Sequence, residues 1–137
     1  MTRTLAIIKP DAFATGKAGL ILAHLENAGF RVLASRVLRL TPEQAGTFYE
    51  VHRERPFYSS LVAFMTSGTC MPLALSRDDA VSTLRVVIGA TDPAQAAPGT
   101  VRKLYAESKE RNAIHASDSD DNAAREIGFF FAGADLT

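Results

Sequence analysis

One histidine stands among several polar side chains in the segment NAIHASDS, which begins at Asn112. A neutral imidazole is nucleophilic near neutral pH, because its ordinary pKa of about 6.5 leaves much of the free base populated. Catalysis also needs orientation: one ring nitrogen faces the substrate while the other donates its hydrogen to an acceptor. Glu126, at the far end of a predicted helix, is a candidate acceptor for His115. His115 is therefore a candidate nucleophile.

The same segment has a simpler interpretation. Ser117 or Ser119 followed by acidic residues is typical of a helix N-cap, so a helix is predicted to begin just after His115. A lone histidine beside such a cap is more often structural than catalytic. The octapeptide leaves both interpretations open, and phosphate-binding side chains elsewhere in the chain would favour the catalytic one.

Three cationic side chains could bind phosphate. Lys9 ends an apolar segment before a proline, while Arg85 and Arg102 flank a long irregular stretch that contains Thr91. Guanidinium groups bind phosphate oxygens in bidentate fashion and keep their charge. The alternative for each arginine is an ordinary surface role. Burial of Lys9 without an anionic partner would be costly, so the lysine is harder to explain in that way.

Two aromatic residues could contribute to the same site. Phe57 follows a proline in the polar sequence RERPFY, and Tyr49 lies on the preceding predicted helix. The alternative for both is core packing, which is the usual role of an aromatic residue. The charged neighbours of Phe57 make its full burial less favourable, which leaves it available as a platform for a planar ligand.

Composition and missing motifs exclude several function classes. Fifteen basic residues balance fifteen acidic ones, so no overall field steers the chain to nucleic acid or to an anionic membrane. Neither GxxxxGK[ST] nor GxGxxG is present. One cysteine and three dispersed histidines give no zinc spacing and allow no internal disulfide. We expect Cys70 to be a buried thiol in a reducing compartment.

The elements that position these residues follow from hydrophobic pattern and capping signals. Strands are predicted at 4–9, 30–40, 70–76 and 127–133, with Pro72 better suited to an edge or a bulge than to a central strand. Helices are predicted at 20–29, from an N-cap at Thr41, at 55–68, at 77–90 and after His115. Residues 90–105 are predicted to form a long loop. Interleaved strands and helices indicate an α/β sandwich of about one sheet with helices packed on a face.

The chain of 137 residues suits a single domain spanning 1–137, with 47% hydrophobic and 22% charged residues. The apolar run before Lys9 is too short for a signal peptide, and no segment reaches the roughly 18 to 20 apolar residues needed to cross a bilayer. We therefore expect a cytoplasmic protein.

Eight short motifs, in order and spacing, resemble the nucleoside diphosphate kinase family over essentially the whole chain. They are IIKPDA, GFR, FYEVH with RPF, FMTSG, GATDP, APGTVR, NAIHASDS and AREIG. The resemblance implies a ping-pong phosphotransferase of low base specificity. A nucleoside triphosphate such as ATP gives its γ-phosphoryl group to a histidine, from which a different nucleoside diphosphate removes it.

The resemblance also implies roles for particular residues. His115 is the nucleophile through Nδ1, Glu126 accepts the hydrogen of the other ring nitrogen, and Ser117 hydrogen-bonds to that carboxylate. Lys9 contacts the transferred phosphate and the sugar hydroxyl. Tyr49 helps to order the region around Lys9 and His115.

The nucleotide contacts are implied in the same way. Arg85, Thr91 and Arg102 correspond to ligands of the β- and γ-phosphates, and Asn112 to a contact with the sugar 3′-hydroxyl. Phe57 corresponds to the aromatic ring on which the base stacks. Stacking tolerates any base, because every base has a π-face.

The resemblance further implies Mg²⁺ carried by the nucleotide, with Asp118 near its water shell, and no metal site built from protein ligands alone. It implies a ferredoxin-like α+β sandwich, in which helices cover a four-stranded antiparallel sheet. Homo-oligomers are also implied, as tetramers or hexamers built from dimers, with the insertion 91–102 in subunit contacts. No nucleic acid or membrane partner is expected.

One residue of the histidine motif departs from the family pattern, and two alternative functions remain open. Ala116 stands where glycine commonly follows the histidine, and its methyl group would crowd the site if that backbone required a positive φ. A nucleotide-binding or regulatory module without turnover is one alternative, which the joint retention of the predicted catalytic residues disfavours. A hydrolase using Ser117 or Ser119 is a weaker alternative, because no nucleophile elbow is present.

Overall fold

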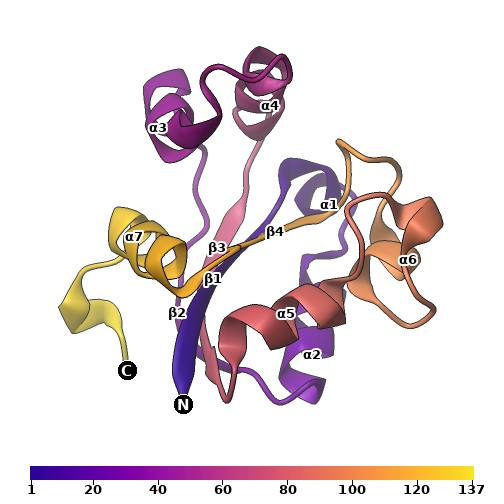
Figure 1. The fold of residues 1–137 in the computed structure, drawn as a ribbon, viewed down its shortest axis with the longest axis vertical. Coiled ribbons are helices and arrows are strands. Elements are labelled where there is room, and N and C mark those ends of the chain that lie inside the picture. The colour runs from indigo at the N-terminus through magenta and orange to yellow at the C-terminus, as the bar shows by residue number, and fades with distance from the viewer.

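A computed structural model describes all residues from Met1 to Thr137. Four strands form one antiparallel sheet in the order β2-β3-β1-β4 (Figure 1). The strands are β1 (Thr2–Ile8), β2 (Arg31–Ser35), β3 (Met71–Arg77) and β4 (Ile114–Ala116). The α-helices are α1 (Pro10–Ala14), α2 (Ala18–Asn27), α3 (Pro42–Phe48), α4 (Tyr58–Met65), α5 (Ala80–Ile88), α6 (Val101–Tyr105) and α7 (Asp120–Phe130), and short 3-10 turns lie at 50–52, 93–95 and 133–135. The sheet confirms the predicted four-stranded antiparallel fold.

Strand β1 is buried on both faces and divides the core into two layers. Ala6 and Ile8 pack with residues of α2 and α5, whereas Leu5 and Ile7 pack with residues of α3 and α7. Successive side chains of a strand point to opposite faces, so a central strand covered on both sides is almost entirely apolar. Helices therefore cover both faces of the sheet, and not one face as the sequence pattern indicated (Figure 1).

The predicted last strand at 127–133 is wrong. Residues 127–130 are the end of α7, and residues 131–133 follow that helix. Ser119 caps α7 by accepting a hydrogen bond from the backbone N–H of Asn122 at 3.1 Å. Phe130 and Phe131 are buried against the sheet from the helix and its end, so their apolar run reflects a buried face. A short apolar run cannot distinguish the two states by periodicity. The fourth strand is β4 instead, and it contains His115.

Strand β3 lies in the centre of the sheet, so the edge position suggested by Pro72 is also wrong. The carbonyl of Pro72 accepts a hydrogen bond from the N–H of Arg36 at 3.2 Å, just beyond the end of β2. The missing N–H of the proline therefore falls where pairing with β2 is ending. A proline at this point therefore costs the central strand little hydrogen bonding to β2.

Two other predicted segments differ from the structure. The strand expected at 30–40 is limited to β2, and a register shift occurs between Val32 and Ala34. The stretch at 90–105 is only partly a loop, because it contains the turn Pro93–Gln95 and helix α6, which Thr100 caps. The predicted N-cap at Thr41 is confirmed by a reciprocal pair of hydrogen bonds with Gln44.

Candidate active site

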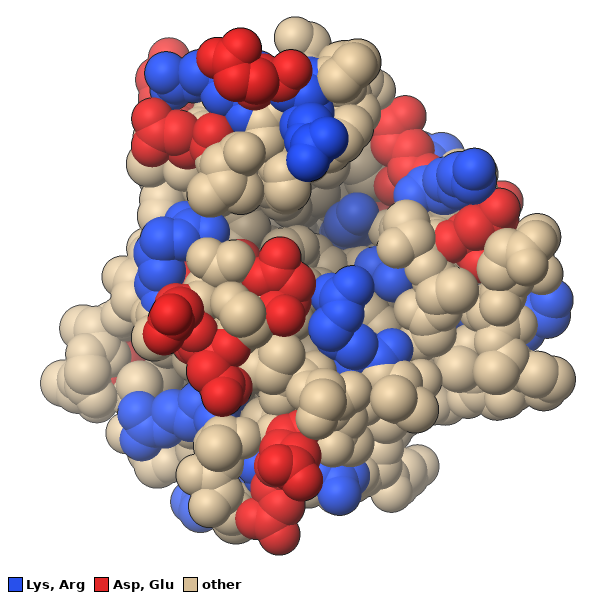
Figure 2. Space-filling view, viewed as in Figure 1, with Lys and Arg blue, Asp and Glu red and all other residues tan.

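A cavity of about 630 Å³ opens beside β4, between the α3–α4 region and the segment from α5 to α6. Figure 2 shows this face hollowed, with Lys and Arg side chains inside and beside the hollow. The cavity brings together ten of the eleven residues predicted from the sequence, which are Lys9, Tyr49, Phe57, Arg85, Thr91, Arg102, Asn112, His115, Asp118 and Glu126. The eleventh, Ser117, is fully buried directly behind it.

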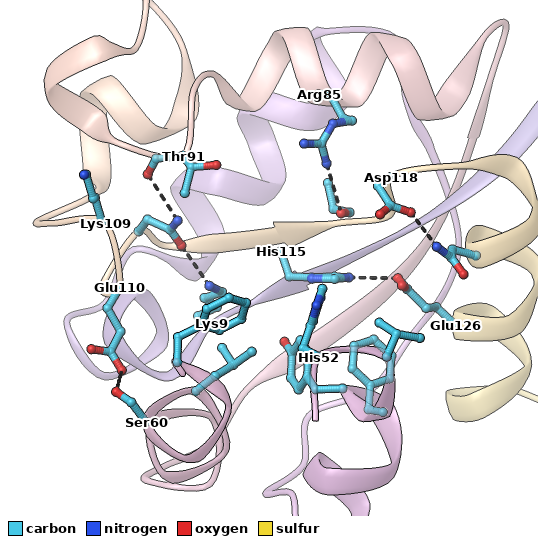
Figure 3. Close-up of a pocket in the computed structure, with 18 of the residues that line it drawn as sticks. Lys9, His52, Ser60, Arg85, Thr91, Lys109, Glu110, His115, Asp118 and Glu126 are labelled. Carbon is cyan, nitrogen blue, oxygen red and sulfur yellow. Dashed lines mark hydrogen bonds and ion pairs between the residues drawn. The ribbon is translucent and has the colours of Figure 1, made fainter. Parts of the chain in front are cut away.

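His115 is held by one ring nitrogen only. Its Nε2 lies 2.8 Å from Oε1 of Glu126 (Figure 3). The Ser117 hydroxyl donates to the same oxygen at 2.8 Å. A carboxylate at Nε2 favours the tautomer with hydrogen on that nitrogen. Nδ1 has no hydrogen-bond partner in the chain, and His115 lines the cavity, so Nδ1 is the nitrogen available to a ligand.

The pairing of β4 with β1 sets the direction of this histidine. His115 lies opposite Ile7, so its side chain is on the face of the sheet that α3 and α7 cover. Ser117 continues from β4, and its backbone N–H donates to the carbonyl of Leu5 at 3.1 Å. Glu126 reaches the histidine from the buried face of α7. Strand, helix and carboxylate together leave the imidazole little freedom to rotate.

Lys9 is a buried ammonium whose hydrogen-bond partner is an amide. Nζ donates to Oδ1 of Asn112 at 2.8 Å, and Nδ2 of Asn112 donates to the carbonyl of Thr91 at 3.2 Å (Figure 3). Burial, followed by the charge of Arg102, lowers the pKa of Lys9 from 10.5 to about 8. A neutral amide gives the ammonium little compensation for lost water, so an anionic ligand would be favourable here.

The two predicted arginines differ in how freely they can bind. Arg102 is buried and donates to the carbonyls of Gly89 at 3.0 Å and Ile114 at 2.7 Å, while its Nε has no partner. Burial, followed by the charge of Arg85, lowers the pKa of Arg102 to about 10. Arg85 makes only one long contact, 3.5 Å to the carbonyl of Ala116. Both lie at the cavity and oppose each other electrostatically, an arrangement that an anion would relieve.

Tyr49 and Phe57 lie at different depths. Tyr49 is buried, its ring packs edge-on to that of His115 with centroids 5.9 Å apart, and its hydroxyl has no hydrogen-bond partner. Burial, followed by the negative charge of Glu126, raises the pKa of Tyr49 well above its usual range. Phe57 is 50% exposed and lies against His52, with ring centroids 5.4 Å apart. The exposed ring at the cavity mouth leaves a face free for a planar ligand.

Asp118 is the predicted carboxylate nearest the cavity opening. Its Oδ1 accepts a hydrogen bond from Asn122 at 2.6 Å, which is the main reason that the pKa of Asp118 is lowered. No group of three or more His, Cys, Asp or Glu side chains could hold a metal ion. A single exposed carboxylate suits Mg²⁺ that keeps most of its waters and arrives bound to phosphates.

Sequence reasoning missed several residues that line or support the cavity. Asn122 could have been found, because it lies four residues after Asp118 and therefore on the same side of a helix start. The hydrogen bond from Ser60 to Glu110, at 2.6 Å, joins segments that no local pattern connects (Figure 3). Other missed residues are Asp11, His52, Lys109 and Arg125.

The concern about Ala116 is not supported. Ala116 lies in β4 and is paired with Ala6, and it does not have a positive φ. The residue with a left-handed backbone is Ala113, with φ of 74°. The positive φ that would have made Ala116 unfavourable occurs instead at Ala113, two residues before the histidine.

Comparisons with known proteins agree with this structure. The computed structure resembles that of the nucleoside diphosphate kinase of Aquifex aeolicus with a TM-score of 0.97 and 45% identity, covering 99% of each chain. A Halobacterium salinarum nucleoside diphosphate kinase, solved in complex with CDP, gives a TM-score of 0.93 and 36% identity over 98% of this chain and 90% of that one. The chain therefore has the ferredoxin-like fold of these nucleotide-phosphorylating enzymes.

The sequence comparisons identify the family. The model described as nucleoside diphosphate kinase matches residues 2–136. A nucleoside diphosphate kinase of Chlorobium chlorochromatii is 58% identical over 132 residues, which cover 96% of this chain and 94% of that protein. The chain belongs to the nucleoside diphosphate kinase family, as its sequence motifs predicted. No helix has the length and apolar character required to span a membrane.

Proposed function

We propose that this protein transfers the γ-phosphoryl group of a nucleoside triphosphate to a nucleoside diphosphate through a phosphohistidine at His115. The observation that carries the proposal is the state of the His115 ring, whose Nε2 is bound by Glu126 while Nδ1 is free at the cavity. A fixed nitrogen nucleophile beside several cations is suited to phosphoryl transfer, where positioning and electrostatic stabilisation supply most of the catalysis.

In the first half-reaction, Nδ1 of His115 forms a bond to the γ-phosphorus as the bond from that phosphorus to the bridging oxygen breaks. The nucleoside diphosphate leaves with the electron pair of that bond. Glu126 accepts a hydrogen bond from the Nε2–H group and stabilises the positive charge that develops on the ring, and Ser117 keeps the carboxylate in place. In the second half-reaction, a different nucleoside diphosphate attacks the phosphorus and restores the free histidine.

The other side chains bind and orient the nucleotide. Lys9, Arg85 and Arg102 neutralise the phosphates, and Thr91 supports them from the loop after α5. Asn112 contacts the sugar 3′-hydroxyl, and Phe57 stacks on the base without selecting it. Tyr49 orders the site by packing against His115. Because stacking is the main contact to the base, purine and pyrimidine nucleotides should both serve.

Mg²⁺ is the cofactor of this proposal, and the Asp118 carboxylate is the group that would contact its water shell. When bound with the nucleotide, the ion would reduce the negative charge that the nucleophile meets. We further propose that the chain forms one domain, acts in the cytoplasm, and assembles as a tetramer or hexamer built from dimers. None of these steps requires nucleic acid or a membrane.

Incubation with γ-labelled ATP and Mg²⁺ tests the proposal. Wild-type protein should acquire label that is stable to alkali, labile to acid and discharged by GDP, and His115→Ala should acquire none. Absence of label on wild-type protein would contradict the proposal. Binding of ADP without labelling would instead indicate a nucleotide-binding module, and alkali-labile label would indicate phosphorylation of a serine.

A further inference from the structure

A second buried carboxylate lies next to the site and has no part in the mechanism above. Asp11, on α1, is only 5% exposed, and its Oδ2 accepts the backbone N–H of Ala113 at 3.0 Å. Its Oδ1 has no hydrogen-bond partner. A carboxylate removed from water with one unpartnered oxygen is costly. The one hydrogen bond that this carboxylate accepts comes from Ala113, which is also the one residue of this region with a left-handed backbone.

Ala113 is the centre of a tight three-residue turn. Its φ is 74°, and the N–H of Ile114 donates to the carbonyl of Asn112 at 2.9 Å. A γ-turn with positive φ at its central residue is rare and strained, and this conformation is energetically unfavourable for alanine. The carbonyl of Ala113 also accepts the backbone N–H of Lys9 at 2.9 Å. Both polar groups of Ala113 are thus bound by the segment that begins the chain's first helix.

This turn lies between two residues of the proposed mechanism. On one side, the side chain of Asn112 joins Nζ of Lys9 to the carbonyl of Thr91. On the other side, β4 begins at Ile114 and presents His115 to the cavity. Relaxation of Ala113 to a negative φ would redirect the chain on both sides at once.

We propose that Asp11 is a positioning residue, whose carboxylate holds Ala113 in its left-handed conformation and thereby places Asn112 and His115 for phosphoryl transfer. The inference rests on the proposed function, since it concerns the same histidine. Asp11 does not contact the reacting atoms. Its effect passes through the backbone of a single turn, and that makes it testable by changing the conformational preference of the turn.

The test is a double-mutant cycle of Asp11→Ala and Ala113→Gly. Asp11→Ala should slow the phosphorylation of His115 at saturating ATP by about tenfold or more, because the strained turn loses its anchor. Glycine adopts positive φ without a side-chain penalty, so the same Asp11→Ala change made together with Ala113→Gly should cost much less. Asp11→Asn keeps an acceptor oxygen and should retain more of the rate than Asp11→Ala. Glu26→Ala, an exposed carboxylate on α2, is the matched control and should leave the rate unchanged.

Exchange of the Ala113 amide hydrogen gives a second measurement that is independent of turnover. The amide should be protected in wild-type protein and Asp11→Asn, and less protected in Asp11→Ala. An Asp11→Ala rate equal to wild type, or an equal loss in the Ala113→Gly background, would overturn the role of Asp11. If Asp11→Ala does not fold, the comparison of Asp11→Asn with and without Ala113→Gly decides the same question. Wild-type protein that takes no label contradicts the proposed function, whereas labelled wild type with an insensitive Asp11→Ala contradicts only this inference.

Discussion

Nε2 of His115 lies 2.8 Å from the carboxylate of Glu126, and that carboxylate is itself bound by the Ser117 hydroxyl. The contact joins the edge strand β4 to the buried face of α7. It assigns different tasks to the two ring nitrogens: Nε2 is the anchored nitrogen, and Nδ1 is the free one. The negative charge also lies where positive charge would develop on the imidazole during phosphorylation.

Replacement of this carboxylate should therefore impair the chemistry more than binding. Glu126→Gln should slow phosphorylation of His115 by about 100-fold, because an amide neither stabilises the imidazolium nor fixes the tautomer as well. ADP affinity should change little. Single-turnover labelling and ADP titration measure the two effects, with the exposed Glu54→Gln as control. An unchanged labelling rate in Glu126→Gln would contradict this role of the carboxylate.

Nucleotide affinity should depend on the ionisation of Lys9. Burial and the charge of Arg102 lower the pKa of Lys9 to about 8, so the free protein loses this positive charge as the pH rises through that value. ADP affinity, measured by calorimetry, should fall over the same range. Lys9→Met should bind ADP more weakly at low pH and lose this pH dependence. Identical pH profiles for the two proteins would show that Lys9 is not the group responsible.

The same shift has a consequence for folding stability with a definite sign. The pKa of Lys9 is about 8 in the folded protein, and the ordinary pKa of a lysine side chain is about 10.5. The unfolded chain therefore binds more protons between these pH values. The free energy of unfolding should therefore rise with pH across this window through this group. Urea unfolding of wild type and Lys9→Met isolates the contribution, since only wild type should show it. A steeper rise of the unfolding free energy with pH in Lys9→Met than in wild type would show that Lys9 is not the group responsible.

Loss of the exposed ring at the cavity mouth should weaken binding of all bases alike. Phe57→Ala should raise the KM for purine and pyrimidine diphosphates by about tenfold, the effect of losing one stacking contact, with little change in kcat. Leu104→Ala removes another half-exposed apolar side chain, on α6 and away from the cavity, and serves as the control. A large effect confined to one base would mean that Phe57 recognises that base rather than stacking on any.

Cys70 should be chemically inert in the folded protein. The residue is fully buried, and burial raises the pKa of its thiol to about 11. Since the thiolate is the reactive form, iodoacetamide at neutral pH should modify the unfolded chain and leave the native one unmodified. Mass spectrometry with and without urea measures the difference. Rapid native modification would show that the surrounding strands open readily.

Ala116→Gly should introduce the residue common in the family without raising either stability or activity. Ala116 is 7% exposed and extended in β4, where glycine gains nothing from its freedom at positive φ and loses a packed methyl group. The expected result is a loss of about 1 kcal/mol in the free energy of unfolding and no gain in activity. A higher rate in Ala116→Gly would mean that the methyl group hinders the nucleotide.

The sequence predicted those parts of the structure that depend on local signals. The N-caps at Thr41 and Ser119 and the strand before Pro10 follow from side-chain chemistry within a few residues. Prediction from the sequence failed where tertiary packing decides whether a segment forms a helix or a strand. The apolar run of Phe129 to Phe131 fits a strand equally well, and only packing against the sheet assigns it to a helix and its end.

The site shows the same division. The family motifs predicted His115 and the side chains that the structure places around one cavity, since the resemblance rests on residue type and spacing. The anchoring of Ala113 by Asp11 spans 102 positions and leaves no pattern in either segment. The left-handed backbone at Ala113 was equally invisible, because alanine gives no sign of positive φ.

The pairing of β1 with β4 also determines when the active site can first exist. Lys9 and Asn112 are 103 positions apart, and Leu5 and Ser117 are 112 apart, so these contacts have high contact order and form slowly. A ribosome adds residues in sequence order, and a nascent chain halted before Asn112 holds Lys9, Arg85 and Arg102 but lacks His115, the proposed phosphoryl acceptor. Phosphotransfer is therefore among the last properties that the chain acquires as it is made.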